Sequence, residues 1–189
     1  MPHDPLHQLV TCLARALQSE QRQRSTAAGM PTVHWQLLNY LQAANRYSNT
    51  PQAMTDYLGL TKGTVSQSLK LLESRGWITR QGDARDRRVM RFFLTPEGAA
   101  LIAEDPGDAT WDQALAALPA ADRESAAATL GRLLRGWQQG RDGLTFGVCR
   151  SCEHFRRQSG NDGQRCGLTG EPLSDADATR ICREHKQPA

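Results

Sequence analysis

The 189-residue sequence has no long apolar run, and aromatic side chains make up only 6% of it. A helix that spans a bilayer needs about 20 mostly apolar residues, so no membrane partner is predicted. Residues 1–10 lack the basic start and apolar core of a signal peptide, so we expect a cytoplasmic protein. The chain also lacks a Ser/His/Asp arrangement, a phosphate-binding glycine loop and a paired-carboxylate pattern. An enzyme is therefore not expected.

Cysteine is scarce, with five in the chain, but four of the five lie close together near the C-terminus. Cys149, Cys152, Cys166 and Cys182 have the spacing C-x2-C-x13-C-x15-C. In a reducing compartment, clustered cysteines indicate metal or redox chemistry more often than structural disulfides. Cys12 stands alone in an amphipathic segment, and we interpret it as an ordinary helix residue.

Helical periodicity dominates the rest of the chain. Helices are predicted over residues 5–24, 32–45, 50–58, 61–75, 95–105, 109–118 and 121–140. Thr32, Thr50 and Thr61 are predicted N-caps, and Gly59 suits the left-handed position after a helix. Strands are predicted over 77–80 and 89–94, joined by a charged hairpin tip over 81–88. The predicted fold class is therefore mainly α with a small β-hairpin wing.

The order helix, turn, helix and hairpin over residues 50–94 is that of a winged helix-turn-helix, whose second helix enters the DNA major groove. Between Thr61 and Arg91 there are eight Lys or Arg and three Asp or Glu, a net charge of +5, which suits a phosphate-binding surface. Gln67 suits adenine, and arginines at the tip suit a narrow minor groove. The residues predicted to contact DNA are Lys62, Thr64, Ser66, Gln67, Ser68, Lys70, Arg85, Arg87 and Arg88.

Two segments resemble the MarR family of transcriptional regulators. They are TPQAMTDYLGLTKGTVSQSLKLLESRGWITR, residues 50–80, and GDARDRRVMRFFLTPEGAAL, residues 82–101, which holds the wing pattern Asp83, Asp86, Arg87 and Arg88. The resemblance covers about residues 5–140 and implies a homodimer that binds double-stranded DNA at a pseudo-palindromic operator. The apolar stripes of residues 6–17 and 130–137 would then pair between subunits. A core contact within one subunit is the alternative for these stripes.

Residues 143–189 lie beyond this resemblance. They are rich in glycine and poor in large apolar residues, so a metal staple is predicted for this tail. Four thiolates suit a tetrahedral zinc ion or an iron–sulfur cluster, [2Fe–2S] or [4Fe–4S]. Iron–sulfur is favoured because zinc modules often carry two CxxC pairs and this chain has one. His154 or His185 could replace a cysteine, and a metal-free set of redox thiols is a further possibility.

The predicted organisation has four parts: a dimerisation helix (1–31), a winged-helix domain (32–105), further dimerisation helices (106–142) and the cysteine-rich extension (143–189). The predicted function is a homodimeric transcriptional regulator switched by a metal centre that responds to redox or iron status. One alternative is a regulator with a structural zinc site and a small-molecule effector. Another is a thiol redox protein.

Overall fold

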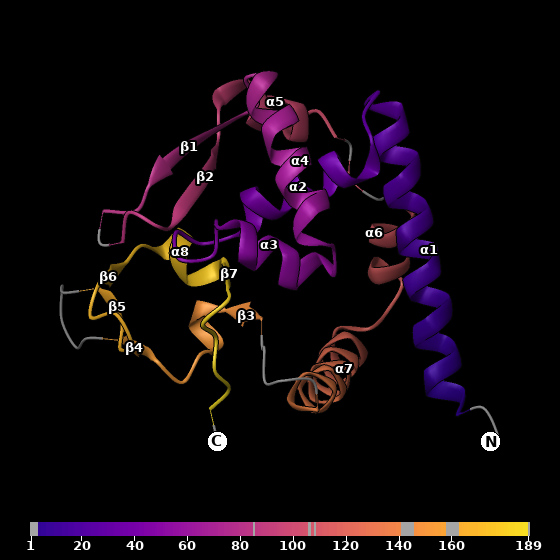
Figure 1. The fold of residues 1–189 in the computed structure, drawn as a ribbon. Helices are drawn as coiled ribbons and strands as arrows, with labels where there is room; N and C mark the ends of the chain where they lie inside the picture. The colour runs from indigo at the N-terminus through magenta and orange to yellow at the C-terminus, as the bar shows by residue number, and fades with distance from the viewer. Residues whose placement is uncertain are drawn as a thin grey trace.

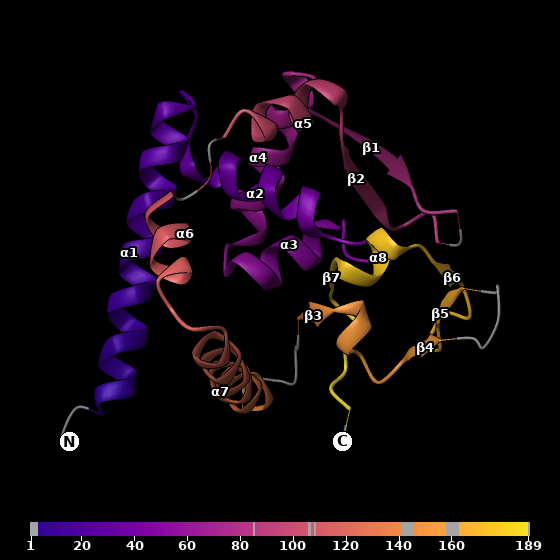
Figure 2. The ribbon, with the colours of Figure 1, turned by 180° about the vertical axis from the view of Figure 1, so that it is seen from behind.

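The computed structural model describes residues 4–84, 86–105, 107, 109–140, 146–157 and 163–188. A helical body carries a two-stranded hairpin on one side, and a small tail made of short strands lies beneath that hairpin (Figure 1). The long helix α1 (Pro5–Ala27) runs along the opposite side of the body, as both ribbon views show (Figure 2). Among the described residues, no helix has the length and apolar character needed to cross a bilayer.

The core lies where α2 (Thr32–Ala43) meets α3 (Pro51–Leu58), α4 (Lys62–Ser74) and α5 (Pro96–Ala103). It is closed by the antiparallel pair β1 (Ile78–Gly82) and β2 (Met90–Leu94), with Ile78 opposite Leu94. Helix α2 is apolar on most of its surface because it is surrounded by the other elements. The largest apolar side chains that are fully buried in this core are those of Trp35, Leu37, Leu38, Met54, Val65 and Leu72.

Local signals set the ends of these helices. The hydroxyls of Thr50, Thr61 and Thr95 each accept a hydrogen bond from the backbone N–H three residues later, at 3.3, 3.1 and 3.1 Å. Gly59 ends α3 with φ of 65°, a left-handed conformation that favours glycine. The N-cap of α2 is Pro31 rather than Thr32, which is the first helical residue, so that cap prediction was wrong.

Gly98 lets α5 lie directly against the turn after α4. A β-carbon at this position would be 2.0 Å from the carbonyl oxygen of Trp77, much closer than atoms can approach. The same carbonyl accepts the backbone N–H of Thr95 at 3.1 Å. The glycine of the Thr95-Pro96-Glu97-Gly98 motif therefore fixes how α5 packs on the winged helix.

Helices α6 (Ala109–Ala116) and α7 (Ala120–Gln139) follow, and neither buries a residue. Helix α1 buries only Ser25 of its 23 residues. Exposed leucines therefore line both α1 and α7: Leu6, Leu9, Leu13 and Leu17 on α1, and Leu130, Leu133 and Leu134 on α7.

The tail is built from very short elements. They are β3 (Gly147–Val148), a 3₁₀ turn η1 (Cys149–Ser151), β4 (Phe155–Arg157), β5 (Gln164–Cys166), β6 (Pro172–Leu173), α8 (Asp175–Thr179) and β7 (Ile181–Cys182). Strand β3 pairs with β7, and β4, β5 and β6 form a three-stranded sheet. The pairing of β3 with β7 joins the first cysteines of the tail to the last.

Candidate DNA-binding surface and cysteine site

Helix α4 presents one polar face to solvent. Val65, Leu69 and Leu72 are buried against the core, at spacings of four and three residues. This leaves Lys62, Ser66, Gln67 and Lys70 exposed, as predicted for residues that read DNA. Leu71 is also exposed, in the last turn of the helix.

Two predicted DNA contacts on α4 have other positions. Ser68 is only 5% exposed, so its prediction as an outward residue was wrong. On the helix surface it lies beside the buried residues Val65, three positions earlier, and Leu72, four positions later. Thr64 is half-buried, and its hydroxyl lies 2.9 Å from the hydroxyl of Thr61, so it takes part in capping the helix.

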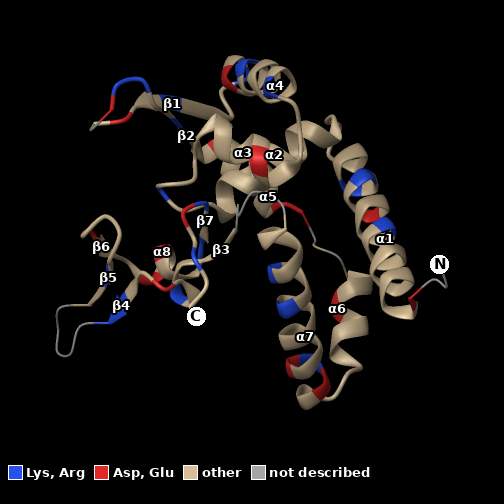
Figure 3. Cartoon of the chain, turned by 60° about the horizontal axis from the view of Figure 1, so that its bottom comes forward, with Lys and Arg blue, Asp and Glu red and all other residues tan. Residues whose placement is uncertain are grey.

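The acidic residues of the wing shape its loop. Asp86 accepts two hydrogen bonds from the Arg88 guanidinium, at 3.0 and 3.1 Å. These bonds raise the pKa of Arg88 and lower that of Asp86. Arg87 is exposed at the tip, whereas Arg85 lies outside the described residues. Lys and Arg residues occur on α4 and on the loop of the wing (Figure 3).

Arg91, which the sequence reasoning did not select, ties the wing to the body. It forms an ion pair with Asp83 and donates to the side-chain oxygen of Asn49 at 3.1 Å. It also donates to the backbone oxygen of Arg46 at 2.6 Å. An arginine in a returning strand carries no local sign of its contacts to the body, because Arg46 and Asn49 are more than 40 residues earlier.

A groove of about 560 Å³ lies between α3, α4 and the wing. Lys62 and Ser66 line it from α4, and Arg88 and Arg91 line it from the wing. Its lining also includes Arg183, a residue of the tail. The groove therefore brings predicted DNA contacts from two elements together with a basic residue of the cysteine-rich segment.

The tail brings its four cysteines to one place. Cys149, Cys152, Cys166 and Cys182 all line a cavity of about 50 Å³, together with His154 and Phe155. Cys149, Leu173 and Cys182 are the buried residues of a small core, against which Tyr47 packs from the body. Within the described ranges, no three Cys, His, Asp or Glu side chains lie together as a metal ion would require. The structure thus gathers the predicted ligands around one cavity without converging them on one point.

Hydrogen bonds differentiate the thiols. A bond between Cys149 and Cys182, together with burial, raises the pKa of Cys149. The same bond lowers the pKa of Cys182 to about 6. The side-chain amide of Asn45 donates to the sulfur of Cys149 at 3.2 Å, and the backbone N–H of Lys186 donates to the sulfur of Cys152 at 3.3 Å. The lowered pKa favours the thiolate of Cys182, and the thiolate is the form that binds metals.

The two histidines near the cysteines differ in position. His154 lines the cavity, and its Nε2 lies 3.3 Å from a carboxylate oxygen of Glu153. His185 is buried outside the cavity lining, with Nε2 3.1 Å from the hydroxyl of Ser151. Burial lowers the pKa of His185. Of the two, only His154 has a position from which it could join the cysteines.

The tail is attached to the body through residues 44–49, which connect α2 to α3 and which we call the junction loop. The backbone N–H of Asn45 donates to the carbonyl of Ile181 at 2.9 Å, and the hydroxyl of Ser48 accepts from the backbone N–H of Arg183 at 2.8 Å. On its other side, the carbonyl of Asn49 accepts from the N–H of Phe92 in β2 at 2.9 Å. The junction loop therefore contacts both the cysteine site and the wing.

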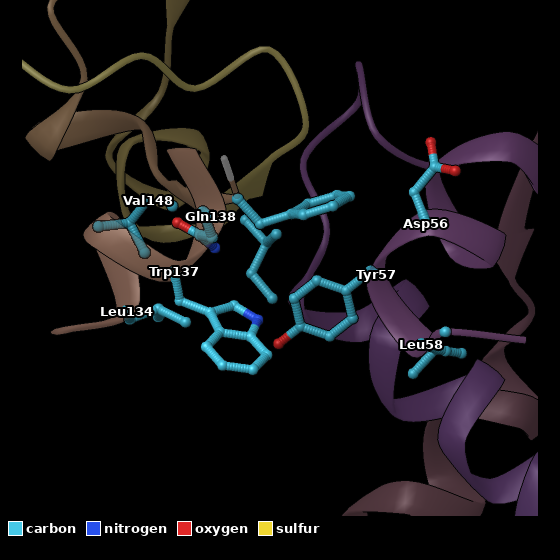
Figure 4. A pocket seen from close by; sticks show the side chains of 11 residues that line it. Asp56, Tyr57, Leu58, Leu134, Trp137, Gln138 and Val148 are labelled. Atoms are coloured by element: carbon cyan, nitrogen blue, oxygen red, sulfur yellow. The ribbon is translucent and has the colours of Figure 1, made fainter. Parts of the chain in front are cut away.

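A larger pocket, of about 740 Å³, lies where α3, α7 and the start of the tail meet. The side chains of Tyr57 and Trp137 point toward one another across it (Figure 4). The ring of Phe146 meets that of Tyr57 edge-on, with 5.1 Å between their centroids. Aromatic walls of this kind suit an apolar or aromatic small molecule.

The arrangement of α2, α3, α4 and the wing can now be compared with known proteins. Residues 28–89 match the sequence model of the MarR family. The matched segment runs from the start of the core to the wing. This match supports the resemblance to the family over residues 50–89, whereas the tail lies outside it.

Solved structures share this fold over most of the chain. The transcriptional regulator PA3341 is 26% identical, with a TM-score of 0.62, over 71% of this chain and 98% of its own. A MarR-family regulator from Silicibacter pomeroyi is 23% identical, with a TM-score of 0.59, over 68% and 86%. The DNA complex of S. aureus MepR is 23% identical, with a TM-score of 0.58, over 72% and 100%. No curated protein matches the chain.

Proposed function

We propose that this protein is a MarR-type transcriptional regulator that binds double-stranded DNA through the exposed face of α4 and the wing. The observation that carries the proposal is the groove in which Lys62, Ser66 and Arg88 lie together. Basic side chains there suit backbone phosphates, and Gln67 on the exposed face of α4 suits base edges. The similarity to MepR, which is described in complex with DNA, supports the same role.

The exposed leucines of α1 and α7 support a homodimer. Leu13 on α1 and Leu133 on α7 belong to stripes that stay exposed in the part of the chain that the structure describes. Exposed apolar patches of this kind mark association surfaces. A two-fold dimer would present two α4 helices and two wings, which suits a pseudo-palindromic operator.

DNA binding is tested by selecting sequences from a random duplex library with the purified full-length protein, then measuring binding by fluorescence anisotropy at fixed salt. Gln67→Ala should reduce the preference for selected over random DNA, because Gln67 is proposed to read bases. Arg87→Ala should weaken binding to both equally, because it is proposed to contact the backbone. Equal losses on both sequences for Gln67→Ala would contradict its reading role, and failure of the wild type to select any sequence would refute the function.

We further propose that the four cysteines hold a metal centre that switches DNA binding, with an iron–sulfur cluster favoured over zinc. The support is the common cavity lined by the four thiols and the N–H groups of Asn45 and Lys186 that donate to the sulfurs of Cys149 and Cys152. Binding of the metal would require the four thiols to converge. This movement would alter the conformation of the tail and of the junction loop. Gain or loss of the centre, by oxidation or iron limitation, would then alter DNA affinity.

The metal is identified by anaerobic purification without added metal, followed by an absorbance spectrum and iron, sulfide and zinc analysis of one sample. A brown protein with iron and acid-labile sulfide supports the cluster, and a colourless protein with one zinc per chain supports the structural alternative. The switch is tested by comparing the operator affinity of the metal-loaded and metal-free forms at fixed salt, since phosphate contacts make affinity salt-dependent. Equal affinities would refute it.

The pocket between α3, α7 and the tail favours a second candidate, in which a small apolar effector regulates binding. Its aromatic lining by Tyr57, Trp137 and Phe146 is the specific support. Burial raises the pKa of Tyr57, so its hydroxyl remains a hydrogen-bond donor at neutral pH. Screening aromatic carboxylates and phenols for release of bound DNA tests this role, with Trp137→Ala expected to abolish any response.

A further inference from the structure

One residue of the tail lies in the groove that the winged helix offers to DNA. Arg183 directly follows Cys182 in the sequence, and its side chain lines the groove with Lys62 and Ser66 of α4 and Arg88 of the wing. Among the described residues of the tail, it is the only one in this lining. Its side chain is 29% exposed, so most of it is covered while part of it remains open to solvent. This placement sets Arg183 apart from the other arginines of the tail.

Both ends of Arg183 are held by the body. Its backbone N–H donates to the hydroxyl of Ser48 at 2.8 Å, and Ser48 in turn donates to Asn45 at 2.9 Å. At the far end, a guanidinium nitrogen lies 3.1 Å from a carboxylate oxygen of Asp56 on α3. The side chain is therefore oriented before any ligand arrives, which lowers the entropy cost of forming a contact.

The ion pair with Asp56 leaves Arg183 able to bind a second anion. A guanidinium has five N–H donors in a planar fork, and one close contact to a carboxylate does not use them all. Lys62 and Arg88 line the same groove, so the potential there favours an anion with several acceptor oxygens. A DNA backbone phosphate has this chemistry, and the exposed face of α4 brings it to this position.

We propose that Arg183 is a DNA backbone contact supplied by the tail, so that the cysteine site forms part of the DNA-binding surface. The proposal rests on the proposed DNA binding by α4 and the wing, and it does not depend on which metal the cysteines hold. The contact is to phosphate, so it adds affinity and leaves sequence preference unchanged. Because Cys182 precedes Arg183, any shift of this cysteine on metal binding moves the contact.

The test is Arg183→Ala in the full-length protein. Its affinity for the DNA duplex that the wild-type protein selects is measured by fluorescence anisotropy between 50 and 200 mM salt. Removing one charge-assisted hydrogen bond to DNA from each subunit should weaken binding by about tenfold or more. The slope of log affinity against log salt should become shallower by about 0.9 for each phosphate that is no longer neutralised, or about 1.8 for a dimer. An unchanged slope would overturn the proposal.

Two variants separate a DNA contact from a structural effect. Asp56→Asn removes the carboxylate charge but keeps the charge of Arg183 and an amide oxygen that can still orient it, so it should bind DNA with the wild-type slope and at least wild-type affinity. If Asp56→Asn weakens binding as much as Arg183→Ala does, the arginine acts by holding the tail against α3 and not by contacting DNA, and the proposal fails. Arg157→Ala removes the same charge from an exposed position on β4 outside the groove, and its slope should match the wild type. A slope change equal to that of Arg183→Ala would reduce the effect to net charge.

The outcomes distinguish this inference from the proposed function. If the wild-type protein selects no DNA, the proposed function fails and this inference with it. If the wild type binds selected DNA and Arg183→Ala binds with the same affinity and slope, the function stands and only the role of the tail in binding DNA is refuted.

Discussion

Asn45→Ala should destabilise the protein more than its small size change suggests. Asn45 is 1% exposed, and its side chain makes three hydrogen bonds. It donates to the sulfur of Cys149 at 3.2 Å and accepts from the hydroxyl of Ser48 at 2.9 Å and from the backbone N–H of Tyr47 at 3.0 Å. Alanine leaves these three groups without their partner inside the structure.

The magnitude follows from the cost of unpaired buried groups. Each broken hydrogen bond that leaves a buried partner unsatisfied costs about 1–3 kcal/mol, and the exposed edge of the loop allows water to satisfy some of them. We expect a loss of about 3 kcal/mol in the free energy of unfolding, against a typical total of about 5–15 kcal/mol. For a chain of this length, that corresponds to a fall in Tm of roughly 6–12 °C.

The assay is urea denaturation followed by circular dichroism, at one protein concentration because a dimer's stability depends on concentration. The matched control is Asn39→Ala on α2, whose side chain makes a local bond to the carbonyl of Trp35 at 2.9 Å. Asn39→Ala should cost less than about 1 kcal/mol. If Asn45→Ala cost no more than this control, the junction loop would not hold the tail in the way the hydrogen bonds indicate.

Three other substitutions test separate parts of the structure. Gly98→Ala should lower the free energy of unfolding, measured by urea denaturation, by about 3 kcal/mol or more, because the β-carbon would lie 2.0 Å from the carbonyl oxygen of Trp77. The control Gly136→Ala on α7, where the space is open, should be neutral or stabilising. A mild effect at Gly98 would contradict the close packing. Burial, with a smaller effect of Arg75, lowers the pKa of His34 below 6.5, so the unfolded chain binds a proton that the folded chain does not. The contribution of His34 to the free energy of unfolding should therefore be fully present above pH 6.5 and fall by up to about 1.4 kcal/mol per pH unit below it. His34→Gln should flatten this part of a plot of stability against pH. Identical plots for the variant and the wild type would argue against a buried neutral histidine. Leu13→Glu on the exposed stripe of α1 should shift the protein toward monomer in sedimentation velocity. The control Arg15→Glu on the polar face of α1 should not. Equal sedimentation of the two variants would exclude this stripe from the dimer interface.

The winged helix could be predicted because its signals are local. Thr50, Thr61 and Gly59 act within one turn of the helices that they start or end, and their neighbours in sequence reveal them. Periodicity also placed Val65, Leu69 and Leu72 on the buried side of α4. The same reasoning failed at Ser68, because a small polar residue beside two buried ones gives no sign of which way it faces.

The tail could not be predicted in the same way. Its strands are two or three residues long, too short for an alternating pattern, and their pairing joins segments far apart, such as Gly147 with Cys182. The spacing of the cysteines suggested that they belong to one site, and they do line one cavity. Nothing local indicated that Asn45 and Ser48, which look like ordinary turn residues, are buried under that site.

The double attachment of the junction loop means that the tail cannot be deleted as a separable module. A chain shortened to residue 140 would leave the N–H of Asn45 without the carbonyl of Ile181, and would expose Tyr47, which packs against the tail's small core. Arg91 of the wing bonds to the same loop, so damage from the truncation would extend toward the groove. Loss of DNA binding in a truncated chain would thus report a broken scaffold, whereas single substitutions at the cysteines can separate the proposed sensing from folding.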